Sequence, residues 1–316
     1  MIGTRGISIK MPGRSYSGQF TPLTEEETEI SSHIRKHVEV LAGEIGERNL
    51  REYNNLEAAI SYIEKTLREL NYGVSFQDFV VEGKIAKNIE VEILGKSQPG
   101  EIIILGAHYD SVINCPGAND NATGVAAILE FARLLKGGNL QRTVRLVAFM
   151  NEEPPFFQTE NMGSLVYARR ANKRREKIVA MFSIETIGYY SDAKGSQRYP
   201  FPLSFFYPDT GNFIGFVGNT SSRSLVHQSI AFFRKNTYFP SEGVAAPGWI
   251  PGVGWSDQWS FWKEGYSAIM ITDTALFRYP YYHTQWDTPD KIDYNRMARV
   301  VAGLKQVVIE LASADK

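Results

Sequence analysis

Cysteine and long apolar runs are scarce in this chain of 316 residues. Its single cysteine, Cys115, cannot form an intramolecular disulfide, so the fold must depend on a hydrophobic core. No uninterrupted apolar segment approaches the roughly 20 residues that a membrane-spanning helix requires. The N-terminal stretch contains no apolar region of the signal-peptide type. We therefore expect no transmembrane segment, and either a cytoplasmic protein or one exported after removal of a leader.

An excess of either charge is also absent, because 34 Lys and Arg residues stand against 35 Asp and Glu residues. Without a strong net field, the sequence offers no general attraction for nucleic acid or an anionic membrane. One basic cluster, residues 169–175, lies where a helix is expected to end, and cations favour that end of a helix dipole. We therefore expect no nucleic-acid partner, and the sequence indicates no particular oligomeric state.

The apolar pattern predicts one α/β domain preceded by a short arm. Residues 1–22 are polar and rich in Gly, Ser and Pro, so we interpret them as an N-terminal arm and residues 23–316 as a single domain. Apolar residues recur at helical spacing over residues 24–42, 54–70, 124–135 and 162–171. Strands are predicted over residues 74–81, 88–94, 102–105, 143–150 and 178–185.

Continuous apolar strands that alternate with helices are typical of a mostly parallel sheet with helices on both faces, a three-layer α/β sandwich. Residues 191–251 are rich in Gly, Pro, Ser and aromatics, and we interpret them as loops with one helix near 222–235. Ligands in open α/β sheets bind beyond the carboxyl ends of the strands. The residues that follow each predicted strand are therefore the first candidates for a site.

Histidine and acidic residues follow three of these strands. His108 and Asp110 come after the strand 102–105, Glu152 and Glu153 after the strand 143–150, and Glu185 ends the strand 178–185. A carboxylate that terminates an apolar strand is poorly explained by packing alone. Adjacent carboxylates such as Glu152 and Glu153 repel each other in a dry cleft unless a cation or a proton separates them.

Two further motifs add to this set. Asp120 lies in the turn PGANDNATG, residues 116–124, and His283 lies in the loop YYHTQWDTPDKID, residues 281–293. Taken alone, Asp120 is typical of an Asx turn or a helix cap. Each histidine, taken alone, is typical of an inert residue near a strand or loop. Together, two histidines and several carboxylates are typical ligands of a borderline divalent ion. The set is too rich for one tetrahedral ion and favours two ions that share a carboxylate, as in hydrolases.

The order and spacing of these motifs resemble the M28 family of zinc aminopeptidases over about residues 30–312. The matching motifs are His-x-Asp, Gly-Ala-x-Asp-x-Ala-Thr-Gly, Asn-Glu-Glu, Glu-x-Ile-Gly and Tyr-His-Thr-x-x-Asp-Thr. The resemblance implies a sandwich of the phosphorylase/hydrolase type and two zinc ions per chain, bridged by Asp120. The remaining protein ligands would be His108 and Glu185 for one ion, and Glu153 and His283 for the other.

The same resemblance gives roles to two more residues. Glu152 would act as the general base, and Asp110 would accept a hydrogen bond from the second ring nitrogen of His108 and so orient it. Glu185 departs from the family pattern, where Asp is frequent, but keeps a carboxylate oxygen as the ligand atom. The resemblance also implies a cis peptide bond after Asp120. Two zinc ions, three carboxylate ligands and one hydroxide would carry no net charge, which suits a buried cleft.

Several other residues allow two interpretations. Asp257 resembles a family segment near the substrate pocket, so it either contacts substrate or caps a loop. Aromatic residues beside it either line a pocket or belong to the core; they are Trp255, Trp259, Phe261 and Trp262. His33 and His37 lie one helical turn apart and are interpreted as a solvated helix face rather than a metal pair. Asp287 is interpreted as a turn residue, and residues 154–157 as a stiff apolar rim of the cleft.

We therefore predict a zinc-dependent metallopeptidase, an aminopeptidase that hydrolyses the N-terminal bond of peptides with a free N-terminus. A metal-bound hydroxide would attack the scissile carbonyl, with Glu152 as the general base. The alternatives are another amide hydrolase or a glutaminyl cyclase-like enzyme on the same scaffold. A noncatalytic binding domain is disfavoured, because none of the implied ligands is missing from the sequence.

Overall fold

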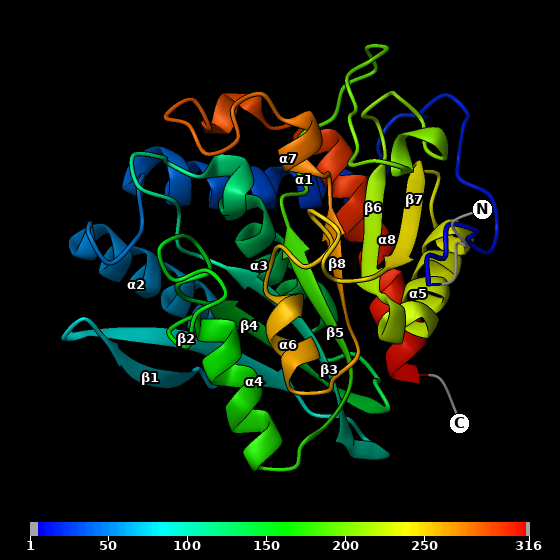
Figure 1. Cartoon of the computed structure of the whole chain (residues 1–316). Coiled ribbons are helices and arrows are strands. Elements are labelled where there is room, and N and C mark those ends of the chain that lie inside the picture. Colours follow the sequence, from blue (N-terminus) through cyan, green and yellow to red (C-terminus); the bar gives the residue numbers. More distant parts are fainter. Residues whose placement is uncertain (1–5, 314–316) are drawn as a thin grey trace.

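The computed structural model describes residues 6–313, in which one eight-stranded sheet carries helices on both faces (Figure 1). The strand order is β1-β2-β4-β3-β5-β8-β6-β7. The strands are β1 (Ser75–Val81), β2 (Lys84–Ile93), β3 (Gln98–His108), β4 (Arg142–Phe149), β5 (Lys177–Glu185), β6 (Ile214–Asn219), β7 (Ser241–Ala246) and β8 (Ala268–Thr272). The central strands β4, β3, β5 and β8 are parallel, whereas β1, β2 and β6 introduce antiparallel pairs. The predicted α/β sandwich is confirmed, with a sheet that is mixed toward both edges.

The helices form the two outer layers of the sandwich. One face of the sheet is covered by α1 (Glu25–Val38), α2 (Tyr53–Glu69), α3 (Thr123–Leu135), α5 (Arg223–Asn236) and α8 (Tyr294–Ser313). The opposite face carries α4 (Gly163–Lys173) and α6 (Gln258–Lys263), and the short helix α7 (Ala275–Arg278) follows the end of β8. Short π-helical or 3-10 segments occupy Glu39–Ile45, Ala118–Ala122, Leu203–Phe205, Thr220–Ser222 and Pro289–Lys291. Within residues 6–313, none of the helices has both the length and the apolarity of a membrane span.

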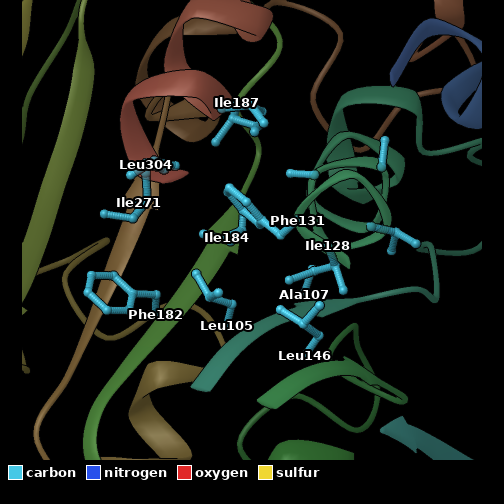
Figure 2. Packing of buried hydrophobic residues seen from close by; sticks show 14 of the residues in the cluster. Leu105, Ala107, Ile128, Phe131, Leu146, Phe182, Ile184, Ile187, Ile271 and Leu304 are labelled. Carbon is cyan, nitrogen blue, oxygen red and sulfur yellow. The ribbon is translucent and has the colours of Figure 1, made fainter. Parts of the chain in front are cut away.

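Strand β3 illustrates why the centre of the sheet is buried on both faces. Ile103 and Leu105 belong to the main core with α3 and α8, whereas Ile102 and Ile104 point the other way, into a cluster with Phe261 of α6. Figure 2 shows how side chains of α3, α8 and the central strands converge in the main core. Each such side chain contributes roughly 1.5–3 kcal/mol by leaving water. The burial of residues 102–105 on both faces holds β3 in the sheet, and His108 follows at the end of this strand.

One buried cation ties the N-terminal helices to the loops at the carboxyl ends of the strands. Helix α1 begins with a capping box at Thr24 and continues into the π-helical segment. The side chain of Arg48, which follows this segment, is fully buried and donates hydrogen bonds of 2.5–3.0 Å to backbone carbonyl groups. These carbonyls belong to Leu41, Gly46, Tyr109, Pro116 and Gly117. Arg48, which the sequence analysis did not single out, thus holds the loops around Asp110 and Asp120.

Strands β6 and β7 lie in the segment 191–251, where the sequence predicts loops and one helix. Both strands are short and contain glycines, which weaken the alternating apolar pattern of a strand. The arm adds to this edge, because Ser8 exchanges backbone hydrogen bonds of 2.7 and 3.0 Å with Ala245 of β7. The division into an arm, residues 1–22, and one domain, residues 23–316, stays a prediction, and residues 1–5 and 314–316 lie outside the described part of the chain.

Candidate metal centre

Three parallel strands bring histidine and acidic residues to the same edge of the sheet. His108 is the last residue of β3 and Glu185 the last residue of β5, while Glu152 and Glu153 follow shortly after β4. Because β3 pairs in parallel with both β4 and β5, the carboxyl ends of the three strands lie side by side. The structure therefore brings together the strand-end residues that the sequence analysis selected.

The imidazole of His108 lies among three carboxylates. Its Nε2 atom is 3.2 Å from Oε2 of Glu185, 3.3 Å from Oδ1 of Asp120 and 3.8 Å from Oε2 of Glu152. His108 is fully buried, and each of these acids is also buried. The cluster is thus shielded from water, which strengthens every electrostatic interaction within it.

Asp120 also faces the second predicted histidine. The Nε2 atom of His283 lies 3.1 Å from Oδ2 of Asp120 and 3.2 Å from Oε2 of Glu153. Each carboxylate oxygen of Asp120 therefore faces a different imidazole, which is the arrangement expected of a bridging ligand. The peptide bond after Asp120 is cis, as the family resemblance implied.

The donor atoms of this cluster fit divalent cations. Four of its buried atoms have no hydrogen-bond partner, namely Nε2 of His108, Nε2 of His283, Oδ1 of Asp120 and Oε1 of Glu153. Unpaired buried polar atoms are costly, and a cation would satisfy them. Two overlapping sets have their donor atoms within 4.8 Å of one another: His108, Asp120 and Glu153, and His108, Glu152 and Glu185. Imidazole nitrogen combined with carboxylate oxygen is a typical ligand set of zinc.

Burial and the nearby charges shift the pKa values of the residues in this cluster. Burial raises the pKa of Glu153 to about 7 and holds the pKa of Glu152 well above its usual range. Burial also opposes protonation of His283, but the neighbouring carboxylates of Asp120 and Glu153 outweigh this effect and raise its pKa to about 10. Protonation thus relieves part of the repulsion among the carboxylates of the cluster, and bound cations would relieve it instead.

Asp110 joins the ends of two strands. Its carboxylate oxygens accept hydrogen bonds from the backbone N–H groups of Glu152 and Glu153, each at 3.1 Å. The Nδ1 atom of His108 lies 3.5 Å from Oδ1 of Asp110 and 3.1 Å from its backbone carbonyl oxygen. Asp110 therefore lies beside the second ring nitrogen of His108, which is hydrogen-bonded to the Asp110 backbone carbonyl, and the orienting role of the carboxylate stays a prediction. Its contact with the two glutamate amides was not foreseen from the sequence.

The side chain of Asp287 has a larger part in the site than its interpretation as a turn residue suggested. Asp287 is fully buried, and its Oδ1 atom accepts hydrogen bonds of 2.8 Å from the Asn119 N–H group and the Tyr279 hydroxyl. Its Oδ2 atom accepts from the N–H group of Asp120 at 3.1 Å. The carboxylate thus holds the turn that presents Asp120. No local sequence signal distinguishes this role from an ordinary turn.

Asp257 lies in the protein interior rather than on the wall of a cleft. Its side chain is fully buried, and burial raises its pKa to about 7. Because it lines no part of the pocket beside Glu185, the prediction of a direct contact with substrate gains no support. Of the neighbouring aromatic residues, Trp255 lines that pocket, whereas Phe261 belongs to the core.

An apolar pocket opens beside Glu185. Its aromatic wall consists of Tyr199, Tyr207, Phe213, Trp255, Phe277 and Tyr282. The ring of Tyr282 stacks on His283, with centroids 3.9 Å apart, so Tyr282 lies between the pocket and the metal centre. The predicted rim, residues 154–157, contributes Pro154 to a separate hollow that also contains Asp110 and Glu153.

His33 and His37 have partners of their own on the helices. The Nδ1 atom of His33 lies 3.3 Å from Oε2 of Glu130. The Nδ1 atom of His37 lies 2.7 Å from the hydroxyl of Tyr62. Both side chains are half-buried, so the solvated helix face that the sequence predicts is wrong in this respect, because Glu130 and Tyr62 partly cover the two rings.

A buried cluster of imidazoles and carboxylates at the carboxyl edge of an α/β sheet is the kind of site found in metal-dependent hydrolases. The sequence matches Peptidase family M28 over residues 88–308, and the chain belongs to this family. The predicted family and the class of peptide hydrolase are thereby confirmed.

Two curated relatives illustrate the range of sequence similarity. The chain is 39% identical over 280 residues to an uncharacterized Escherichia coli protein, YfbL, and the match covers 86% of this chain and 85% of that protein. It is 25% identical over 237 residues to a probable aminopeptidase of Saccharomyces cerevisiae, YDR415C. That match covers 72% of this chain but only 57% of the yeast protein.

Solved structures with similar folds include a zinc aminopeptidase from Bacillus subtilis, which superposes with a TM-score of 0.72 at 16% identity. The match covers 90% of this chain and 96% of that one. A glutaminyl cyclase from Porphyromonas gingivalis superposes with a TM-score of 0.65 at 19% identity, over 89% of this chain and 98% of that one. At these identities the likeness concerns the fold.

Proposed function

We propose that this peptidase is an aminopeptidase that holds two zinc ions and removes the N-terminal residue of a peptide. The observation that carries the proposal is the position of Asp120, whose two oxygens face His108 and His283 at 3.3 and 3.1 Å. One ion would be held by Asp120, His108 and Glu185, and the other by Asp120, Glu153 and His283. These five side chains would leave positions on both ions for water and substrate.

Glu152 is the candidate general base. Its carboxylate lies beside the proposed ligands, 3.8 Å from Nε2 of His108, and is buried. When bound, zinc polarises the scissile carbonyl and lowers the pKa of water from about 16 to about 7. Glu152 would accept a proton from the attacking water and return it to the leaving amine. Asp110 supports this role, because it fixes the backbone from which Glu152 projects.

Action at the N-terminus requires recognition of a free α-ammonium group and room for the first side chain. The carboxylate oxygens that border the proposed zinc positions can accept hydrogen bonds from an ammonium group. The pocket beside Glu185 supplies the space for a side chain. We therefore propose that the first residue of the peptide enters this pocket while its amino group stays among the acids.

The test measures zinc content and the release of free amino acid from a panel of aminoacyl 4-nitroanilides. N-acetylated versions of the same compounds serve as matched controls. We expect zinc-dependent turnover of the free amines and at least about 100-fold slower turnover of the acetylated compounds. Comparable rates on both sets would reject aminopeptidase action in favour of another amide hydrolase.

A cyclase-like reaction remains the second candidate, because the glutaminyl cyclase fold also superposes over most of the chain. Incubation with a peptide that begins with glutamine distinguishes the two. Cyclisation removes ammonia and keeps the peptide intact, whereas an aminopeptidase releases free glutamine. We expect release without cyclisation.

A further inference from the structure

Four residues on four neighbouring strands form one row across the sheet, starting at the metal centre. Glu185 of β5 pairs with Thr272 of β8, Thr272 pairs with Gly215 of β6, and Gly215 pairs with Glu242 of β7. Residues that pair directly across a sheet point to the same face. Glu185 and Glu242 therefore point to the same side of the sheet. Their Cα atoms are three strand spacings, or roughly 14 Å, apart.

The row runs along the apolar pocket. All four of its residues line the pocket, and so do Met270, Val217 and Val244 of the adjacent row. Gly215 has no side chain, so no Cβ atom stands between Thr272 and Glu242, and the methyl groups of Thr272 and Thr274 border this position. The pocket therefore begins at one carboxylate, runs over an apolar floor and a glycine gap, and reaches a second carboxylate.

The surroundings of Glu242 suit the binding of a cation. Its nearest cation, Arg234, lies 4.0 Å from Oε2. Arg234 donates its own hydrogen bonds to Ser241, at 3.0 Å to the hydroxyl and 2.6 Å to the carbonyl, and to the carbonyl of Pro12 at 3.0 Å. None of these hydrogen bonds goes to Glu242, so its carboxylate can accept hydrogen bonds from a ligand.

Two phenol groups add acceptor oxygens near this end of the pocket. The hydroxyls of Tyr199 and Tyr207 donate to the carbonyls of Pro208 and Gly243, at 2.6 and 2.7 Å, so their oxygens can still accept hydrogen bonds. Burial raises the pKa of the Glu242 carboxyl, while Arg234 and Ser15 lower it. The side chain is 26% exposed and borders the groove beneath the arm, so it keeps contact with water and can stay ionised.

We propose that Glu242 selects substrates whose first residue is lysine or arginine. This inference rests on the proposed aminopeptidase function and names its substrate class. The methylene groups of such a side chain would lie over the apolar floor and the glycine gap, and its cationic end would reach Glu242. An uncharged side chain of equal length would gain the same apolar contacts without the ionic hydrogen bond.

The experiment compares lysine with norleucine, which has the same carbon chain and lacks the amino group. kcat/KM is measured on the lysyl, arginyl, norleucyl and leucyl 4-nitroanilides with the zinc-reconstituted protein. We expect lysyl and arginyl substrates to exceed the norleucyl substrate by about 10- to 100-fold, the usual range for one hydrogen bond to a charged group. Glu242→Gln should lower the ratio of lysyl to norleucyl kcat/KM to about one.

Asp209→Asn is the matched control variant. Asp209 is an exposed acid in the same segment as Tyr207, and it does not line the pocket. The Asp209→Asn substitution removes one negative charge from the same region, as Glu242→Gln does. Because Asp209 does not line the pocket, the preference for lysyl and arginyl substrates should remain. A loss of preference in both variants would attribute the effect to general electrostatics and overturn the proposal.

A binding measurement separates this inference from the proposed reaction. Calorimetry with L-lysinamide and L-norleucinamide in the Glu152→Gln background, where turnover should be at least about 100-fold slower, reports on the pocket. If norleucyl or leucyl substrates are cleaved as fast as lysyl ones, the aminopeptidase stands and the role of Glu242 is rejected. If no substrate is cleaved, the proposed function fails. In that case tighter binding of lysinamide that Glu242→Gln abolishes would still support the site, and equal binding of the two amides would reject it.

Discussion

Asp287 holds Asp120 in place through a 3.1 Å hydrogen bond from the Asp120 N–H group to its Oδ2 atom. Replacing Asp287 with Asn would put an amide NH2 group opposite one of two backbone donors, so one buried donor would lose its acceptor. We expect zinc affinity to fall by roughly 10–100-fold and the free energy of unfolding by about 1–3 kcal/mol. Zinc competition and urea titrations measure both. Tyr279→Phe, which removes one hydrogen bond to the same carboxylate, is the control and should cost only about 1 kcal/mol.

Glu152 and Glu153 are adjacent, and one substitution in each distinguishes their proposed roles. Glu152→Gln cannot accept the proton of water, so zinc content should be kept while kcat falls by about 10²–10⁴-fold. Glu153→Gln replaces an anionic ligand with a neutral amide, so zinc itself should be weakened or lost. Metal analysis and turnover of both variants provide the comparison. Loss of zinc in the first variant and retention in the second would reverse the two assignments.

Asp110 contacts His108 and the glutamate amides, so its replacement should disturb the site without unfolding the protein. We expect Asp110→Asn to lower zinc affinity or kcat/KM by roughly 10–100-fold. Circular dichroism checks that the fold is kept, and a zinc chelator titration measures affinity. Unchanged affinity and activity would mean that the contacts at 3.1 Å to the two amides are dispensable.

Removal of zinc should destabilise the chain and alter the cluster more than the rest of the fold. With two ions proposed, zinc-reconstituted protein should approach two zinc per chain by elemental analysis. Ligand linkage adds about 2.7 kcal/mol per site when free zinc is 100-fold above its dissociation constant, so chelation should lower the unfolding temperature clearly. Full activity at one zinc per chain would contradict the binuclear proposal.

His37 should make stability depend on pH in the acid range. Burial, with smaller contributions from His33 and Lys36, lowers its pKa from 6.5 to about 4. The unfolded state therefore binds more protons between these values, and stability falls as pH decreases from about 6.5 to 4. His37→Gln should lessen the loss of unfolding free energy between pH 7 and pH 5 by about 1 kcal/mol, since the side chain is only partly buried. Equal pH dependence of both proteins, measured by urea titration, would reject this role.

The sequence predicts the residues at the carboxyl ends of β3, β4 and β5 well, because the carboxyl ends of neighbouring parallel strands lie at the same edge of a sheet. His108, Glu152, Glu153 and Glu185 each follow or end an apolar strand, so topology alone brings them close. Asp120 and His283 lie on loops, and only the ordered motifs of the family pointed to them. For Asp257 the sequence could not tell a buried acid from a pocket residue, because both kinds occur in loops before an apolar strand.

Features that depend on long-range packing were not predictable in this way. β6 and β7 carry glycines that hide their alternating pattern, although they position the row that ends at Glu242. Asp287 and Arg48 act on backbone groups far away in the sequence. A hydrogen bond from a side chain to a distant backbone group does not depend on the residue type of its partner. The sequence pattern therefore does not indicate such a bond, and the structure is needed to find it.

Arg48 lies outside the segment 88–308 that matches the peptidase family, yet it donates hydrogen bonds to the carbonyls of Tyr109, Pro116 and Gly117. A fragment trimmed to the family segment would leave these carbonyls without their donor, next to the turns that carry Asp110 and Asp120. A fragment that folds on its own should therefore extend beyond residues 88–308 at its N-terminal end and include Arg48. Engineering that shortens the chain or exchanges its N-terminal helices has to retain this one cation.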